Sequence, residues 1–265
     1  MQADKTIMAC GSREWKIFLP YEYLKMKNMR GILLIAFFSL FAMAHGQGAG
    51  SALDFNGVAG GIRVGNSATL NFGLGDFSLE LWVRVPSTLT LEELVVVGKR
   101  PVCGNSNFWN IRTSPTDGIY LEVSNSALGE DDRCGAGLIY DGEWHHVAFV
   151  RRGREIRSYR DGSLFATTTL RFDYNVDNSV DMFIGDGVCA GIGRNGRMQG
   201  NVDELRIWSR ALTEEQIRHK MTERLRNAEP GLVAYYRLDE GADNTCPGGQ
   251  DVCDASGNAN HGVKF

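Results

Sequence analysis

The sequence has 265 residues, 43% of them hydrophobic, with 28 Lys and Arg against 32 Asp and Glu. This hydrophobic share excludes a wholly disordered chain and a collagen-like repeat. The net charge of −4 argues against a nucleic-acid partner, because such binding needs a basic surface that neutralises phosphates.

A secretory leader is predicted at the N-terminus. The apolar run 32–44 (ILLIAFFSLFAMA) follows several basic residues and ends in a small-x-small triplet, which is the pattern of a signal peptide. Its thirteen residues fall short of the roughly twenty that cross a bilayer, so no stable membrane span is expected after cleavage. We predict a leader over 1–46, with Met26 or Met29 as alternative starts, and an uncleaved anchor as the other interpretation.

Five cysteines follow the leader, and secreted proteins meet oxidising conditions in which disulfides form. They are Cys103, Cys134, Cys189, Cys246 and Cys253. Cys246 and Cys253 flank a Gly/Pro-rich turn and are expected to close a local loop. One of the other three stays outside intramolecular disulfides. A zinc site is disfavoured because paired CxxC or HxxxH spacings are missing.

Short strands separated by turn signals dominate the predicted structure. Residues 79–85 alternate strictly, with Leu and Val on one face and Glu, Trp and Arg on the other, which indicates a half-buried strand. The apolar run 94–97 suits a strand buried on both faces. Asp161-Gly162 predicts a type I′ hairpin, because both positions favour positive φ. Further strands are predicted at 108–112, 119–123, 137–140, 145–150, 155–160, 164–170, 182–184, 205–208 and 232–238.

One short helix is predicted in the C-terminal half. Thr213 to Gln216 form a capping box, and Ile217, Met221 and Leu225 continue it as a narrow apolar stripe. About a dozen strands with one late helix predict an all-β fold, a two-sheet antiparallel sandwich, and not a parallel α/β sheet.

Four segments carry a further pattern when they are taken together. They are 52–57 (ALDFNG), 77–83 (FSLELWV), 141–148 (DGEWHHVA, followed later by Asp161-Gly162) and 200–208 (GNVDELRIW, running into 211–213). In this order and spacing they resemble the laminin-G-like domains of the concanavalin A-like lectin/glucanase superfamily, with distant similarity to pentraxins. The resemblance covers roughly residues 50–226 and implies a jelly-roll sandwich, which we predict as one domain over 47–265.

The tail segments 231–241 and 254–262 also resemble this family. In bacterial multidomain members such a stretch often opens the next repeat, whereas in pentraxins the last strand closes the first sandwich. We expect the second arrangement, because 232–238 is too apolar to hang free.

The superfamily includes laminarinase-type hydrolases, which would need two carboxylates on one strand face. Neither Glu-x-Asp-x-x-Glu nor Glu-x-Asp-x-Glu occurs in the chain. Glu130-Asp131-Asp132 lies in a predicted loop, and the adjacent Asp203 and Glu204 should face opposite sides of a sheet. His145 and His146 are expected to open a core strand and not to hold a metal. No catalytic residue is predicted.

The resemblance also raises calcium, which related sandwiches bind through oxygen ligands in loops at one end of the sheets. Two loops correspond in position, so Asn105, Asn107 and Asp186 are candidate ligands. The second loop lacks the acidic cluster of pentraxins, and the alternative is that all three are turn residues. If the loops adjoin as the family topology implies, Cys103 bonds to Cys189; a bond from Cys103 to Cys134 is the alternative.

Exposed aromatic side chains are candidate sugar contacts, because a pyranose has an apolar C–H face that stacks on a ring. Trp109 is the leading candidate and Tyr140 the second, with a buried Trp109 as the alternative. Arginines cluster over 151–160, so Arg157 is a candidate contact for acidic glycans, with a solvated surface as the alternative.

We therefore predict a secreted, extracellular or cell-surface module without catalytic activity. It would bind carbohydrate or an extracellular protein, with calcium as the one candidate cofactor. A structural or adhesive module without a small ligand is the alternative, and a polysaccharide-degrading enzyme is the weakest interpretation.

Overall fold

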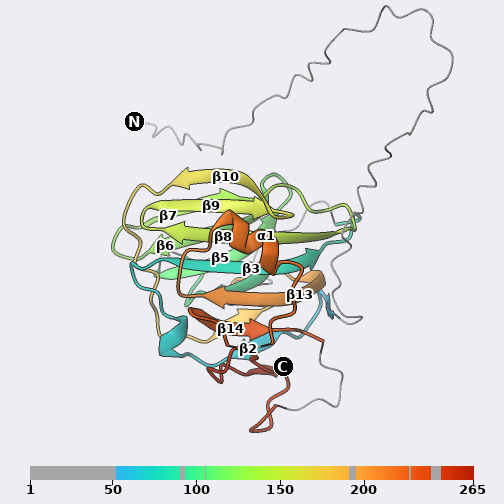
Figure 1. The fold of residues 1–265 in the computed structure, drawn as a ribbon. Helices are drawn as coiled ribbons and strands as arrows, with labels where there is room; N and C mark the ends of the chain where they lie inside the picture. The colour runs from blue at the N-terminus through green and yellow to red at the C-terminus, as the bar shows by residue number, and fades with distance from the viewer. Residues whose placement is uncertain (1–51, 90–92, 105, 191–194, 227, 240–245) are drawn as a thin grey trace, which may run out of the picture. The chain divides into compact units, whose positions relative to one another are not determined.

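Two β-sheets form the framework of the described chain (Figure 1). The structure, a computed structural model, describes residues 52–89, 93–104, 106–190, 195–226, 228–239 and 246–265. The predicted leader and Asn105 lie outside these residues, so the leader stays a prediction. Within the described ranges, no helix combines the length and the apolar character that a bilayer crossing needs.

The first sheet, sheet A, has the strand order β1-β13-β3-β8-β9-β10, and β14 also pairs with β13. Its strands are β1 (Leu53–Asn56), β3 (Phe77–Arg84), β8 (Trp144–Arg152), β9 (Glu155–Arg160), β10 (Ser163–Thr169), β13 (Gln199–Trp208) and β14 (Leu232–Tyr236). All of these pairs are antiparallel. The predicted Asp-Gly hairpin joins β9 to β10, with φ of 51° at Asp161 and 78° at Gly162.

The second sheet, sheet B, has the order β15-β2-β11-β4-β5-β6-β7. Its strands are β2 (Ile62–Val64), β4 (Glu93–Lys99), β5 (Phe108–Ser114), β6 (Gly118–Asn125), β7 (Glu130–Gly135), β11 (Met182–Ile184), β12 (Asn195–Arg197) and β15 (Gly262–Lys264). The short β12 joins β4 in parallel, while the other pairs are antiparallel. A single 3₁₀ turn within the described residues, η1, spans Ala68–Leu70.

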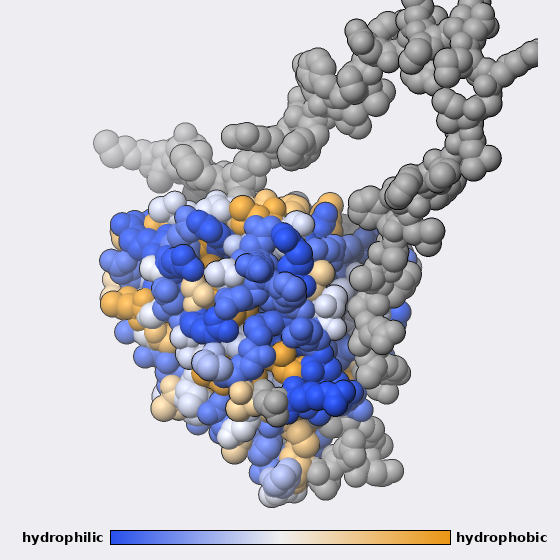
Figure 2. Space-filling view, viewed as in Figure 1, coloured by the Kyte–Doolittle hydropathy of each residue, from blue (hydrophilic) through white to orange (hydrophobic). Residues whose placement is uncertain are grey.

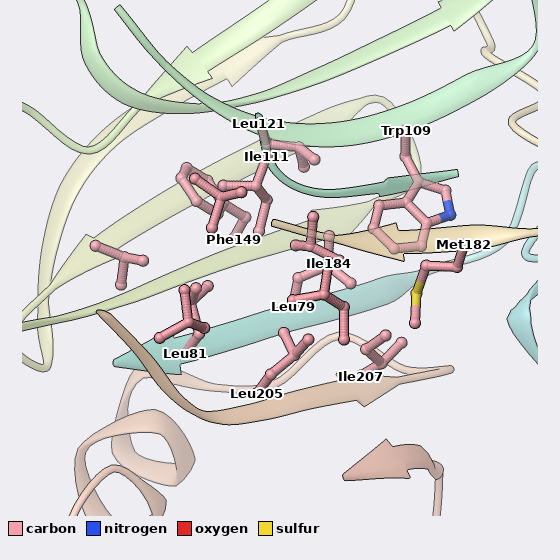
Figure 3. Close-up of a cluster of buried hydrophobic side chains, with 14 of the residues drawn as sticks. Leu79, Leu81, Trp109, Ile111, Leu121, Phe149, Met182, Ile184, Leu205 and Ile207 are labelled. Atoms are coloured by element: carbon pink, nitrogen blue, oxygen red, sulfur yellow. The ribbon is translucent and has the colours of Figure 1, made fainter. Parts of the chain in front are cut away.

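The main core lies between the two sheets and takes one alternating set of side chains from each (Figure 3). Leu79 and Leu81 of β3 face this core together with Ile111 of β5 and Leu121 of β6, and all four are fully buried. Alternation along each strand then turns the neighbouring residues to the outer faces of the sheets. These outer faces are where ligand contacts can form.

The helix α1 (Glu214–Lys220) packs over the outer face of sheet A and closes a second apolar cluster there. Thr213 caps the helix as predicted, with the complete capping box to Gln216. Ile217 is buried beneath the helix against Trp208 and Leu212. Figure 2 shows this side of the domain as mainly hydrophilic, with apolar residues in separate small groups.

The end of α1 is held by buried polar groups of sheet A. Arg206 of β13 donates hydrogen bonds to the backbone carbonyls of Lys220 and Glu223, each at 2.5 Å, and lies 3.6 Å from the fully buried Glu80 carboxylate. The Trp208 indole N–H donates to the same carboxylate at 3.1 Å. Carbonyls at a helix end have no partner within the helix, so a buried cation there both satisfies and stabilises them.

The C-terminal segment is part of the sandwich. β14 pairs with β13 of sheet A, and β15 pairs with β2 of sheet B. Between them, Asp254 accepts hydrogen bonds from the backbone N–H groups of Tyr235, Ser256 and Asn260. The prediction that the apolar tail closes the sandwich is therefore confirmed.

Two strand predictions were wrong. The stretch 137–140 makes only an isolated bridge, between Gly137 and Gly118. The acidic stretch from Glu130, predicted as a loop, is strand β7 at the edge of sheet B. Its charges are paired across or beside the sheet: Arg133 contacts Glu122, and Asp132 accepts a hydrogen bond from Arg171 at 2.7 Å. These pairings let a charged sequence form an edge strand.

Candidate functional site

A row of directly paired residues crosses the outer face of sheet B. The strand registers align Val263, Arg63, Phe183, Gly98, Asn110, Glu122 and Arg133, one from each of seven neighbouring strands. The adjacent row, which includes Ile184, Val97, Ile111 and Leu121, is part of the core. The first row therefore points away from the core.

Gly98 lies in the middle of this row and packs closely against Asn110. A Cβ built on Gly98 would lie 2.5 Å from the Asn110 Cβ, so a larger residue would need the strands to shift. A shallow depression that is open to solvent lies beside Gly98 on this face. It is lined by Val95, Gly98, Arg100, Asn110, Arg112, Phe183, Asp186, Gly187, Val188 and Cys189.

One carboxylate organises the polar side of the depression. Glu122 accepts hydrogen bonds from Asn110 at 2.9 Å, from Arg100 at 3.2 Å and from Arg133 at 3.3 Å. Arg112 lies 4.0 Å from Glu122. The Glu122 side chain is only 4% exposed, so these arginines hold a buried charge that would otherwise be costly.

Aromatic rings support the guanidinium groups. The Arg100 guanidinium lies 3.9 Å from the centre of the Phe108 ring, and the Arg133 guanidinium lies 5.2 Å from that of Tyr120. Such cation–π contacts restrict the orientation of flexible side chains. The donors around the depression are therefore arranged before any ligand arrives.

A disulfide closes one end of the depression. Cys103, after β4, bonds to Cys189, after β11, with their Cα atoms 5.4 Å apart. Asp186, at the start of the second loop, accepts hydrogen bonds from the Gly187 backbone at 2.7 Å and from Arg197 at 2.9 Å. The bond thus fixes the loop of Arg100 beside the loop of Asp186, as the family topology implied.

The apolar side of the depression is the ring of Phe183, which is partly exposed on β11. Phe265 packs edge-on against it, with ring centres 5.9 Å apart, and is 57% exposed. Val188 is exposed at the rim. The arrangement joins an exposed aromatic ring to a cluster of fixed hydrogen-bonding groups, which is the combination that recognises ring-shaped polar molecules.

A family model described as the concanavalin A-like lectin/glucanases superfamily, of laminin-G type, matches residues 56–218, more than half of the chain. The chain belongs to this superfamily. Among curated proteins, none matches the sequence.

Solved structures are also similar to this chain. A protein from Bacteroides ovatus ATCC 8483, named for an inferred carbohydrate-binding role, is 26% identical with a TM-score of 0.61. The match covers 81% of this chain and 57% of that protein, so the chain spans little more than half of its relative. In all, 303 chains of solved structures match this chain.

Two of these other matches are more distant. Domain 4 of an extracellular arabinanase from Geobacillus stearothermophilus, solved with arabinotriose, is 24% identical over 65% of this chain and 76% of that chain, with a TM-score of 0.48. A heptameric pentraxin from Limulus polyphemus is 15% identical over 62% of this chain and 82% of that chain, with a TM-score of 0.41. Both TM-scores are below 0.5, so neither informs the function of this chain.

The three ligand contacts predicted from the sequence do not come together in this superfamily member. Trp109 is fully buried and packs near Phe72 in the core (Figure 3), so the prediction that it stacks on a sugar was wrong. Tyr140 is partly buried against the core. Arg157 is exposed on β9, 2.7 Å from Glu155. Strand β9 belongs to sheet A, whereas the depression lies on sheet B.

The predicted calcium ligands are also dispersed. Asn105 lies outside the described residues. Asn107 accepts hydrogen bonds from the Ser126 backbone and hydroxyl at 2.9 and 3.0 Å, as a turn residue would. Asp186 contacts Arg197, and within the described ranges no group of three or more His, Cys, Asp and Glu side chains could hold a metal. Calcium binding therefore stays a prediction.

The two histidines have separate structural roles. His145 joins the turn residues Asp141 and Asp161, at 2.9 and 3.0 Å. The hydrogen bond to Asp161 is the main cause of a raised His145 pKa. His146 is buried beside Glu80, and burial lowers its pKa to about 3. His146 is therefore neutral at physiological pH.

One argument made from the sequence against catalysis was wrong in its geometry. Glu204 has φ of 51° at a β-bulge in β13, so the strict alternation that would separate Asp203 from Glu204 is broken. Burial, and then the neighbouring Glu204, raise the pKa of Asp203 to about 7. Glu204 accepts hydrogen bonds from Tyr235 and Arg206, which fix it in sheet A, away from the depression in sheet B.

The residues that sequence reasoning missed are Phe183, Gly98 and the arginines around Glu122. A signal for the last group was present: polar Asn110 and Arg112 alternate with apolar Trp109 and Ile111 on one strand. That alternation assigns Trp109 to the core and the polar pair to the outer face.

Proposed function

We propose that this protein is a carbohydrate-binding module without catalytic activity, and that the depression on the outer face of sheet B is its binding site. The observation that carries the proposal is the direct pairing of Phe183 with Gly98 and of Gly98 with Asn110. It puts a partly exposed ring on one side of the depression and fixed donors and acceptors on the other.

A sugar ring fits both sides of this depression chemically. Its C–H face would stack on Phe183, while its hydroxyl groups would accept from Arg100 and donate to carboxylates such as Asp186. The relation to the Bacteroides ovatus protein supports the carbohydrate class. The two disulfides, Cys103–Cys189 and Cys246–Cys253, are compatible with secretion to the cell exterior or surface.

Calcium would act in this proposal as an aid to binding. Asp186 would have to exchange its contact with Arg197 for the ion, and loop oxygens would complete the site. Binding in the presence of calcium but not of a chelator would support that role. Equal binding in both would leave the direct contacts of the depression as the whole site.

The test is a glycan array with the purified protein, run in calcium and again in chelator, with wild type and Phe183→Ala. We expect glycan signals that fall about tenfold or more in Phe183→Ala, the loss of one stacking contact. Phe165→Ala is the matched control, because Phe165 is 48% exposed on β10 of sheet A. Equal signals from wild type and Phe183→Ala would contradict the proposed site.

A second candidate function is binding of acidic glycans at the arginines of β8 and β9. Arg157 is exposed there, but Arg151 is buried and Arg154 donates to the carbonyls of Leu170 and Arg171. Loss of binding in Arg157→Ala, with none in Phe183→Ala, would favour this candidate.

A further inference from the structure

The charges around the depression are balanced in number. Arg112 contacts Glu93 at 3.0 Å, Arg197 contacts Asp186 at 2.9 Å and Arg100 contacts Glu122 at 3.2 Å. Two flanking pairs continue the pattern, Arg133 with Asp131 at 3.2 Å and Arg63 with Asp181 at 3.9 Å. Five guanidinium groups and five carboxylates therefore share this face.

We infer that the site selects uncharged sugars over glycans that carry carboxylate or sulfate groups. The inference rests on the proposed function and names its ligand class. An anion would meet no net positive charge here, and it would have to lose water next to carboxylates that already occupy the arginines. A neutral hydroxyl avoids this conflict, because it accepts from a guanidinium and donates to a carboxylate at the same time.

Burial strengthens the selection. The Arg112 side chain is 8% exposed, Asp186 is 9% exposed and Glu122 is 4% exposed. Their partners Glu93, Arg197 and Arg100 are 34%, 36% and 17% exposed. Each inner pair therefore has one buried member, and salt screens it less than a fully exposed pair. Binding of the preferred glycan should accordingly depend little on ionic strength.

The experiment compares uncharged and anionic glycans of matched backbone, such as dextran and dextran sulfate, together with the neutral and acidic members of the array. We expect the bound glycans to be uncharged, with affinity that changes less than about twofold between low and high salt. Binding restricted to sulfated or carboxylated glycans, with affinity that falls steeply in salt, would overturn the inference.

Removal of one carboxylate tests whether the balance of charges is the cause of the selection against anionic glycans. Glu93→Gln leaves Arg112 without its rim partner and should create salt-sensitive binding of dextran sulfate, about tenfold above wild type at low salt. Glu122→Gln should do the same from the buried side, so a folding defect in one variant leaves the other to decide. Glu155→Gln, which removes the partner of Arg157 on sheet A, is the matched control. No gain in either site variant would overturn the charge-balance argument.

The two proposals fail differently. An acidic glycan that binds wild type and is lost in Phe183→Ala would refute the ligand class while the site remains. A glycan that binds wild type and Phe183→Ala with equal affinity would refute the site itself.

Discussion

Gly98 of β4 and Asn110 of β5 are direct cross-strand partners on the outer face of sheet B, and only a glycine leaves room for the Asn110 side chain. The close approach of β4 and β5 at this point therefore depends on the missing Cβ, and the depression lies beside it. Only β4 separates Phe183 on β11 from Asn110 on β5, which belongs to the polar cluster around Glu122.

Gly98→Ala is expected to distort the strands that form the depression. The new methyl group would lie 2.5 Å from the Asn110 Cβ, so the strands must separate, and glycan affinity should fall about tenfold or more. Titration of the array's strongest glycan, well below the melting temperature, measures the change. Gly65→Ala is the control, because a Cβ on Gly65 would meet no atom within 4 Å. Unchanged affinity in Gly98→Ala would mean that the ligand binds elsewhere.

The two disulfides should contribute unequally. Cys103 and Cys189 are 86 residues apart, whereas Cys246 and Cys253 are 7 apart. The chain-entropy relation then predicts about 4.5 kcal/mol for the first bond and about 2.5 kcal/mol for the second. Denaturant unfolding of the two double serine variants measures both. Only loss of the first bond should also weaken glycan binding, since it borders the depression; equal binding losses would contradict that role.

The end of α1 should depend on Arg206. Replacing it by Met removes the donor to the carbonyls of Lys220, the last helix residue, and of Glu223 beyond it, and leaves Glu80 buried without its arginine, at a cost of about 3–5 kcal/mol. Arg218→Ala breaks only the exposed pair with Glu214 and should cost under about 1 kcal/mol. Urea unfolding distinguishes these values. A loss in Arg206→Met as small as that of the control would show that the buried network does not anchor the helix.

Asp203 should make stability depend on pH. Burial, and then Glu204, raise its folded pKa to about 7, above the ordinary 3.8, so the protonated form is favoured in the folded state. The stabilisation of the folded state that comes from this difference in pKa is fully present below about pH 3.8 and is lost as the pH rises through about 7.

Asp203→Asn removes the free-energy cost of holding an ionised, buried carboxylate in the folded state at high pH. The variant should melt higher than wild type at pH 8, with a much smaller difference at pH 4, as measured by thermal unfolding at both values. Asp76→Asn, at an exposed carboxylate, serves as the comparison. An equal difference between wild type and Asp203→Asn at both pH values would refute the role of Asp203 ionisation.

Local patterns predicted much of the fold. The Asp161-Gly162 hairpin, the Thr213 capping box and the apolar closing strand are each encoded within a few neighbouring residues, and all three are confirmed. Strand β7 was missed for the opposite reason. Its charges are neutralised by distant partners such as Glu122 and Arg171, which no local pattern reveals.

The candidate site was harder to predict because it depends on register. Phe183, Gly98 and Asn110 come from three segments of the chain and meet only because their strands align. Asp186, predicted as a calcium ligand, lines the depression, but its binding of calcium stays a prediction. Trp109 was assigned to the ligand although its neighbour Asn110 occupies that face. A one-residue shift in the register of a strand moves every side chain to the opposite face of the sheet. The assignment of Trp109 to the wrong face therefore made its predicted ligand contact wrong.

The most direct test of the central claim is a crystal structure of the protein with the strongest uncharged glycan from the array. The account predicts a sugar ring against Phe183, with hydroxyl groups on Arg100 and Asn110 at the depression beside Gly98. A glycan bound instead on sheet A, beside α1 or Arg157, would contradict it.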